Sequence, residues 1–278
     1  MISYVHNVAT TTVEVPTVTV KNPAQSEPAP PDRYRISLYK PNYIIPFYYT
    51  ATPDQGVYAG QTPEGQSLKQ IEFKFQFSVR VPVLSNIGGM PVTLYGAYTQ
   101  LSYWQSYVRS PFFRESDYEP AIFFQYALGH PLPWGWQWQS ADVGAVHQSN
   151  GRGGNLERSW NRIYVGSTLA HNAWTVRVRA WYPIRDQSLM EHNPDIAHYL
   201  GYGEFVVSYH RGRQTFSLLS RNTVISGFSR GGTQLSWSFP LVQELHGYVQ
   251  FYSGYGQSLI EYNHRTEALG IGISLNDY

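Results

Sequence analysis

A histidine, a serine and an asparagine fall in phase with one another around a single predicted β-hairpin. His147 and Ser149 are two residues apart, so both side chains project from the same face of an extended strand. The next five residues, 150–154, include three glycines and predict a turn. In an antiparallel hairpin centred near Gly154, Asn161 lies opposite His147, because the two residues are equally far from that centre. The sequence therefore predicts that the three side chains meet on one face of a sheet.

These three residue types are sufficient for ester hydrolysis by a serine nucleophile. Ser149 would be the nucleophile and His147 its general base. Asn161 would accept the other imidazole N–H through its amide oxygen and hold the ring in the tautomer that the base requires. A neutral orienting residue suits an apolar surface, where an ionised carboxylate is costly to bury. The alternative is that the three side chains simply lie in an interfacial layer where polar groups are tolerated.

Two other features suggest chemistry less strongly. Residues 227–231 match the G-x-S-x-G pattern of a nucleophile elbow, but no helical period follows them, so we interpret this segment as a turn. The nine histidines show no HExxH or comparable metal-ligand spacing. His192 and His198 flank a predicted loop at 193–195 and are expected to be loop residues.

The hairpin belongs to a chain whose hydrophobicity alternates with period two almost throughout. One stripe of apolar residues continues over the 13 residues from 71 to 83, with polar residues on the opposite face. A strand in a soluble sandwich usually has about five or six residues, whereas a tilted membrane strand needs about 9–11. The stripe therefore favours a strand that crosses a membrane.

Similar stripes predict an all-β fold, a transmembrane antiparallel β-barrel of about twelve strands. We expect residues 1–33 to form an extended arm and 34–278 a single barrel domain. The alternative fold is a large soluble β-sandwich. The predicted strands are 43–50, 69–83, 91–104, 118–129, 135–149, 159–171, 173–184, 197–210, 213–222, 231–241, 243–255 and 266–277. No helix is needed.

Composition narrows the class of protein further. The 278-residue chain has 20 Lys and Arg against 19 Asp and Glu, which leaves no basic surface for nucleic acid. The absence of cysteine excludes disulfides and thiolate chemistry. The 23 Tyr and 8 Trp are typical of membrane interfaces. No apolar run reaches about 18 residues, so insertion must use strands. The first residues show no signal-peptide pattern, so we expect a mature form.

The hairpin motif also carries a resemblance to a known family. The segments 147–152 and 158–162 resemble the active-site hairpin of outer membrane phospholipase A, and the likeness runs from about residue 40 to the C-terminus. Further matching segments are 98–100, 110–112, 114–115, 118–120, 193–196 and 252–260. The resemblance implies a twelve-stranded, multi-pass barrel of the bacterial outer membrane. It also implies calcium-dependent hydrolysis of phospholipid acyl esters, with phospholipase A1, A2 and lysophospholipase activity.

The same resemblance implies roles for individual residues. Ser149, His147 and Asn161 would be nucleophile, base and orienting residue, and the Gly151 N–H would form the oxyanion hole with help from calcium. Calcium (Ca²⁺) would be bound by the backbone carbonyl of Arg152 and by position 157. This chain departs from the family there, because the family has a serine at that position and this chain has Glu157, itself a good ligand for a hard cation.

The resemblance further implies that the active enzyme is a homodimer. The remaining calcium ligand would come from the partner subunit, in the region of Arg109 and Ser110. Gln100 is in phase with apolar neighbours and should face lipid, where two such amides could satisfy each other across a dimer axis. The alternative is that Gln100 only reaches toward the interface.

Two rival functions remain open from the residues alone. One is a non-enzymatic outer-membrane porin or adhesin in which the Ser, His and Asn cluster is incidental. The other is an outer-membrane protease barrel, which would need acidic residues and histidine at the rim of the lumen.

Overall fold

The computed structural model describes residues 35–184, 191–223 and 226–278. Residues 33–278 form one compact unit. The extended arm predicted at 1–33 lies outside the described residues, so the proposed division into arm and barrel stays a prediction.

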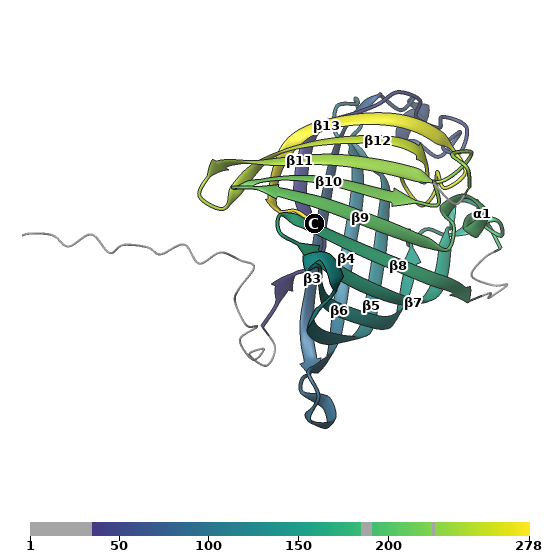
Figure 1. The fold of residues 1–278 in the computed structure, drawn as a ribbon. Helices are drawn as coiled ribbons and strands as arrows, with labels where there is room; N and C mark the ends of the chain where they lie inside the picture. The colour runs from purple at the N-terminus through teal and green to yellow at the C-terminus, as the bar shows by residue number, and fades with distance from the viewer. Residues whose placement is uncertain (1–34, 185–190, 224–225) are drawn as a thin grey trace, which may run out of the picture. The chain divides into compact units, whose positions relative to one another are not determined.

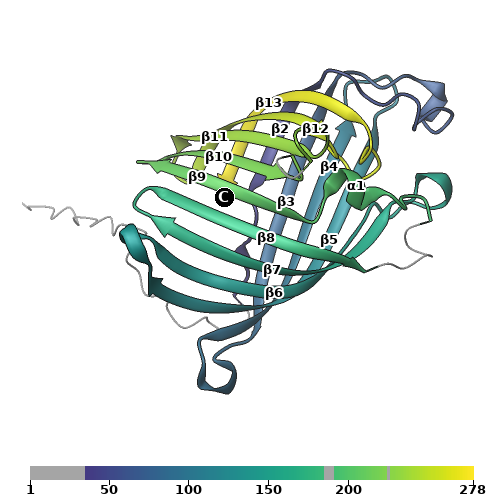
Figure 2. The ribbon, with the colours of Figure 1, turned by 45° about the vertical axis from the view of Figure 1, so that its right-hand side comes forward.

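Twelve long antiparallel strands close into a barrel, as predicted (Figures 1 and 2). Each strand pairs with its neighbour in the chain, and the pairing of β2 with β13 closes the ring. The strands are β2 (Asn42–Thr50), β3 (Ile71–Leu84), β4 (Val92–Gln105), β5 (Phe112–Pro131), β6 (Gln137–Ser149), β7 (Ser159–His171), β8 (Trp174–Ile184), β9 (Gly203–Arg211), β10 (Gln214–Arg221), β11 (Gly232–Val242), β12 (Leu245–Tyr255) and β13 (Arg265–Asn276). Closure leaves no exposed sheet edge, which excludes the sandwich alternative.

Short elements complete the described chain. A two-residue strand, β1 (Ser37–Leu38), pairs with β3. The helical segments are the 3₁₀ turns η2 (Pro63–Gly65), η3 (Ile87–Gly89), η4 (Pro133–Gly135) and η5 (Gly154–Leu156), and the α-helix α1 (Ile196–Leu200). No helix in the described ranges has the length and apolar character needed to cross a membrane.

Two predicted strand boundaries were wrong. The strand predicted at 197–210 begins only at Gly203, because α1 occupies Ile196–Leu200. The two end residues of α1 lie one helical turn apart, and both are buried. The prediction that no helix is needed was wrong for the same reason. The strand predicted at 118–129 extends over 112–131, so β5 includes a polar segment at its start that carries no apolar stripe.

The two faces of the sheet have opposite chemistry. On β3, Ile71 and Phe77 are exposed on the outer wall, whereas Glu72, Lys74 and Ser78 are buried in the lumen. This arrangement inverts that of a soluble protein and is typical of a barrel whose outer wall contacts lipid. The predicted parity of this strand is therefore confirmed.

The two ends of the barrel differ in their connections. At one end, strands are joined by long segments, 51–70, 106–111, 150–158, 185–202, 222–231 and 256–264. At the other end, the connections include the two-residue turns 172–173, 212–213 and 243–244. The connection between β6 and β7 belongs to the long-loop end. In bacterial barrels, long loops are extracellular and short turns are periplasmic.

An ion-pair cluster lies inside the barrel near the long-loop end. Arg114 donates to both carboxylate oxygens of Glu72, at 2.9 and 2.8 Å, and to Glu261 at 2.6 Å. Burial raises the pKa of the Glu261 carboxyl, but the Arg114 charge and the Ser258 hydroxyl outweigh burial and hold that pKa below its usual value. All three charged side chains are almost fully buried, so the charge of each must be balanced by the opposite charge of its partner.

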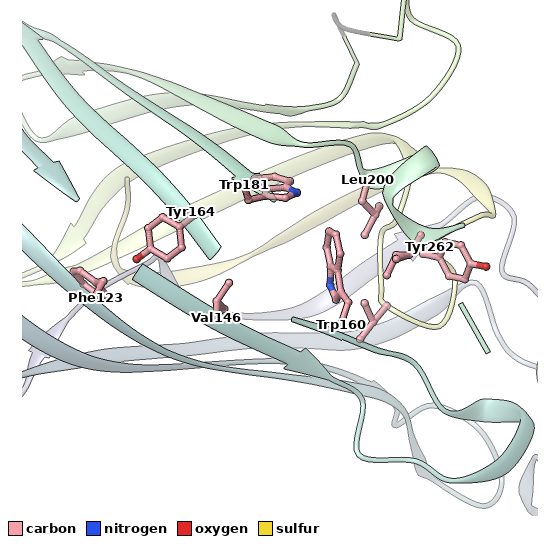
Figure 3. Packing of buried hydrophobic residues seen from close by; sticks show 9 residues of the cluster. Phe123, Val146, Trp160, Tyr164, Trp181, Leu200 and Tyr262 are labelled. Atoms are coloured by element: carbon pink, nitrogen blue, oxygen red, sulfur yellow. The ribbon is translucent and has the colours of Figure 1, made fainter. Parts of the chain in front are cut away.

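An aromatic cluster fills the lumen behind the β6–β7 hairpin (Figure 3). Val146 of β6, Trp160 and Tyr164 of β7, and Trp181 of β8 pack together with Leu200 of α1. Trp160 is fully buried and contacts Trp181 edge to face, with ring centroids 6.3 Å apart. This packing supports the inner face of the hairpin. The alternate residues of the same strands project from its outer face.

We expect Arg114→Met to destabilise the barrel by roughly 3–5 kcal/mol, because it leaves two buried carboxylates without their counter-charge. The free energy of unfolding would be measured by denaturant titration in lipid or detergent. The matched control is Arg109→Met, which removes an exposed ion pair with Glu64 and should change stability by less than about 1 kcal/mol. Equal stabilities of the two variants would contradict the role assigned to the lumen cluster.

Candidate active site

The β6–β7 hairpin brings His147 and Asn161 directly opposite each other. The two residues are backbone partners in the ladder, and Ser149 pairs with Ser159 at its end. On the same face, Val143 and Ile163 are exposed on the outer wall. The polar residues therefore project outward with the apolar stripe, because side chains on a strand alternate between its two faces.

A short hydrogen bond joins the two opposite side chains. His147 Nδ1 and Asn161 Oδ1 are 2.7 Å apart. An amide oxygen only accepts hydrogen bonds, so Nδ1 carries the proton and Nε2 is left as an acceptor. A neutral imidazole in this tautomer is suited to take a proton from a hydroxyl group.

Ser149 is the last residue of β6 and lies two residues beyond His147 on the same face. Its side chain is half-buried, and its hydroxyl has no hydrogen-bond partner within the part of the chain that the structure describes. Tyr118 of β5 is its neighbour on the other side. The hydroxyl is therefore free to engage a substrate from the lipid-facing side.

A shallow groove runs along the outer wall beside these residues. His147 and Asn161 lie in its lining together with small and aliphatic side chains of β5, β6 and β8, including Pro120, Ala145 and Ile184. Because proline and alanine have small side chains, they leave a hollow in the wall beside the imidazole. An elongated apolar molecule that lies against the barrel can therefore approach the imidazole without entering the lumen.

Gly151 follows the hairpin strand and adopts a left-handed backbone conformation, with φ of 63°. A Cβ atom at this position would lie 3.0 Å from the ring of Tyr118, so both the conformation and the contact favour glycine. Its N–H donates to no acceptor among residues 35–184, 191–223 and 226–278. This N–H is one donor of the kind that an oxyanion hole requires.

The oxygen atoms assigned to calcium lie in the same loop. The Arg152 carbonyl and the Glu157 carboxylate accept no hydrogen bond from any described residue, so both are available to a cation. The described residues contain no cluster of three or more acidic, His or Cys side chains that could hold a metal. The ligand set assigned from the sequence consists mainly of neutral oxygens, which do not require such a cluster.

Ser110 lies on the separate connection between β4 and β5. Its carbonyl accepts a hydrogen bond from Gln66 Nε2 at 2.6 Å. No hydrogen bond within the described chain joins Ser110 to Arg152 or Glu157. The Arg152 guanidinium does reach β5, the strand that follows this connection, where it donates to the Phe113 and Arg114 carbonyls.

Gln100 faces outward on β4, between Phe77 and Tyr118. Its side-chain amide already has two partners within the chain, because the Tyr98 hydroxyl donates to its oxygen and its nitrogen donates to Ser102. One N–H and one lone pair remain free, since a primary amide offers two of each. A second amide could still pair with these remaining groups.

The weaker motifs lie in a turn and in the short helix α1. Ser229 lies in the turn between β10 and β11, where its hydroxyl donates to the Ser226 carbonyl at 2.7 Å. The interpretation of residues 227–231 as a turn is confirmed. His198 lies in α1, with its Nδ1 2.8 Å from Arg230, and not in a loop as expected.

Sequence reasoning assigned no role to Asn150 or Glu115. Both side chains are buried on the lumen side of the hairpin and are hydrogen-bonded to each other. Their polar, inward-facing pattern is shared by most lumen residues, so the signal that could have found them is their place in the matching segments 147–152 and 114–115.

Comparison with known proteins gives consistent matches. A family model described as phospholipase A1 matches residues 21–275. The phospholipase A1 of Salmonella typhimurium is 37% identical over 248 residues, which cover 88% of this chain and 82% of the relative. The Escherichia coli K12 protein of the same name is 36% identical with the same coverage.

Two solved structures share the fold. The outer membrane phospholipase dimer of Salmonella typhi with bound calcium superimposes with a TM-score of 0.81 at 33% identity, covering 87% of this chain and 93% of that one. Outer membrane phospholipase A from Escherichia coli gives a TM-score of 0.81 at 34% identity, covering 87% of this chain and 98% of that one.

Proposed function

This chain belongs to the phospholipase A1 family, and from that premise we propose that Ser149, His147 and Asn161 are the catalytic groups of a calcium-dependent outer-membrane phospholipase. The observation that carries the proposal is the 2.7 Å hydrogen bond between His147 and Asn161 on the lipid-facing wall, two residues from Ser149. The family is enzymatic and its barrels reside in the bacterial outer membrane, so a porin, an adhesin or a protease is not needed to explain the cluster.

The first half of the reaction would acylate the enzyme. Ser149 Oγ attacks the ester carbonyl of a phospholipid while His147 Nε2 removes the hydroxyl proton. Asn161 stabilises the imidazolium by accepting from Nδ1–H. The Gly151 N–H donates to the oxyanion. The imidazolium then protonates the leaving alkoxide, which departs as a lysophospholipid.

The second half would release the fatty acid. Water attacks the acyl ester on Ser149, and His147 again removes a proton. Collapse of the second tetrahedral intermediate expels the serine alkoxide, which recovers its proton from His147. The fatty acid leaves and the starting state is restored.

Calcium would be held by the Arg152 carbonyl and the Glu157 carboxylate, both oxygen groups that suit a hard cation. When bound, calcium would supply positive charge near the developing oxyanion. This proposal is supported by a relative with the same fold, the Salmonella typhi dimer, which was solved with bound calcium. The remaining ligand would come from the partner subunit's Ser110, in keeping with the dimer found for that relative.

The proposed active form is therefore a homodimer. Gln100 retains one free N–H and one free lone pair on the outer wall, which can pair with Gln100 of the partner subunit. In hydrocarbon, such polar contacts have little competition from water. The relative solved with calcium is also a dimer.

The substrate would enter from the membrane and not from solution. The hairpin turn belongs to the long-loop end of the barrel, so we infer that the site lies at the level of the outer leaflet. The shallow groove beside His147 is open to lipid along the wall. A phospholipid can place its ester carbonyl at Ser149 with its acyl chains still in the bilayer.

We expect Ser149→Ala to lower the release of fatty acid from phospholipid micelles by a factor on the order of 10⁴ or more, because the nucleophile is lost. The barrel should fold normally, since the side chain makes no described hydrogen bond. The matched control is Ser229→Ala, which removes the serine of the other candidate motif and should leave activity unchanged. Full activity in purified Ser149→Ala would refute the mechanism.

Asn161→Ala should reduce kcat by roughly 10- to 1,000-fold, because the imidazole loses the group that fixes its tautomer while the nucleophile remains. The loss should be smaller than that of Ser149→Ala in the same assay. An unchanged kcat would show that Asn161 does not orient His147.

A calcium chelator should stop turnover, and excess calcium should restore it. Glu157→Gln should raise the calcium concentration for half-maximal activity by roughly tenfold, because one anionic ligand is neutralised. Glu244→Gln, on an exposed turn at the opposite end of the barrel, is the matched control and should not change that concentration. Full activity in excess chelator would remove calcium from the proposal.

A further inference from the structure

We propose that Asn150 is a positioning residue that holds the loop 150–158 in the geometry required for catalysis. The inference rests on the proposed function, because it concerns the oxyanion donor Gly151 and the calcium-binding carbonyl of Arg152. Asn150 lies between Ser149 and Gly151 in the chain, but its side chain points to the lumen side and is 4% exposed. It therefore contacts neither substrate nor solvent.

The Asn150 side chain uses its full hydrogen-bonding capacity. Its Nδ2 donates to Glu115 Oε1 at 3.1 Å and to the Leu156 carbonyl at 2.8 Å. Its Oδ1 accepts from the backbone N–H groups of Arg152 at 3.3 Å and Arg158 at 3.0 Å. Two donors and two lone pairs are all that a primary amide possesses. One side chain thus fixes three separate points of the same loop.

Apart from the Arg158 guanidinium, which donates to the Asn155 and Glu157 carbonyls, the loop has little other support of its own. The ladder ends with the bond from the Asn150 N–H to the Arg158 carbonyl at 3.0 Å. Beyond it, the described residues contain one backbone hydrogen bond inside the loop, from the Glu157 N–H to the Gly154 carbonyl. The directions of the Gly151 N–H and the Arg152 carbonyl thus depend on Asn150, since a long loop without ladder bonds has many accessible conformations.

Glu115 anchors this arrangement to the barrel interior. Its fully buried carboxylate accepts from Asn150, from the Ile260 N–H at 3.1 Å and from Arg152 Nε at 3.2 Å. The Arg152 guanidinium also donates to the Arg114 carbonyl on the same strand. The loop is therefore tied to a rigid strand and to the segment between β12 and β13, which keeps the side-chain amide itself in place.

The decisive variant is Asn150→Asp, which preserves shape and acceptors but removes both N–H donors and adds a carboxylate beside Glu115 and its neighbour Asp117. We expect kcat to fall by about 100-fold or more, as when an oxyanion donor is lost, with KM within about threefold of wild type. The calcium concentration for half-maximal activity should rise in parallel. The matched control is Asn155→Asp, an exposed asparagine of the same loop whose side chain makes no described hydrogen bond, and it should behave as wild type.

The experiment separates a positioning role from a purely structural one, because kcat is compared between equal numbers of folded sites. Labelling of Ser149 by a sulfonyl fluoride at saturation counts the folded sites, so kcat can be expressed per folded barrel. Thermal unfolding of each variant is measured alongside. If Asn150→Asp does not fold, Glu115→Gln tests the same anchor and should lower kcat by roughly tenfold, because its amide is a weaker acceptor for Asn150 and Arg152.

The outcomes separate the two levels of inference. A wild-type protein without calcium-dependent phospholipase activity would refute the proposed function. Suppose that the wild type is active, that Ser149→Ala is inactive, and that folded Asn150→Asp keeps the wild-type kcat and calcium response. This outcome would overturn only the role of Asn150. If only Glu115→Gln can be tested, an unchanged kcat and calcium response in that variant would overturn the role equally.

Discussion

The structure depends on the need of every backbone N–H and C=O group for a partner where water is absent. In hydrocarbon, an antiparallel sheet meets this need only when its last strand pairs with its first, as β13 does with β2. Closure divides the side chains by parity into an outer apolar set and an inner polar set. The buried charges of Arg114, Glu72 and Glu261 follow from this division, because the interior must be filled by groups that satisfy one another.

The same division explains why the proposed triad on the outer wall consists of neutral side chains. A charged carboxylate beside the imidazole would face lipid and lack compensation. Asn161 provides the oxygen that the imidazole N–H needs without a net charge. The groups that do carry charge, Glu115 and Arg152, lie behind the hairpin, where each has several partners. The hairpin thus separates the neutral side chains of the proposed triad from charged side chains of the interior.

Much of the fold was predictable because a period of two is a strong local signal. The stripe of β3 and the pairing of His147 with Asn161 both follow from counting positions. The start of β5 at Phe112–Asp117 was missed because its polar residues do not alternate with apolar ones. Their types depend instead on the residues that they contact in the lumen. Helix α1 was missed because Leu200 is buried against distant residues of the aromatic cluster. The hydrogen bonds of the Gln100 and Asn150 side-chain amides depend on rotamers and on close neighbours, which cannot be predicted from the spacing of residues in the sequence.

Under the proposed mechanism, the groove beside His147 would open sideways into the bilayer, so encounters between enzyme and lipid would occur by two-dimensional diffusion. The relevant concentration is then the mole fraction of susceptible lipid in the surrounding leaflet, and not an amount per volume of solution. Diluting the leaflet with inert amphiphiles slows the reaction even when total lipid is constant. Rates from vesicles and from detergent micelles are comparable only after both are expressed per unit of surface.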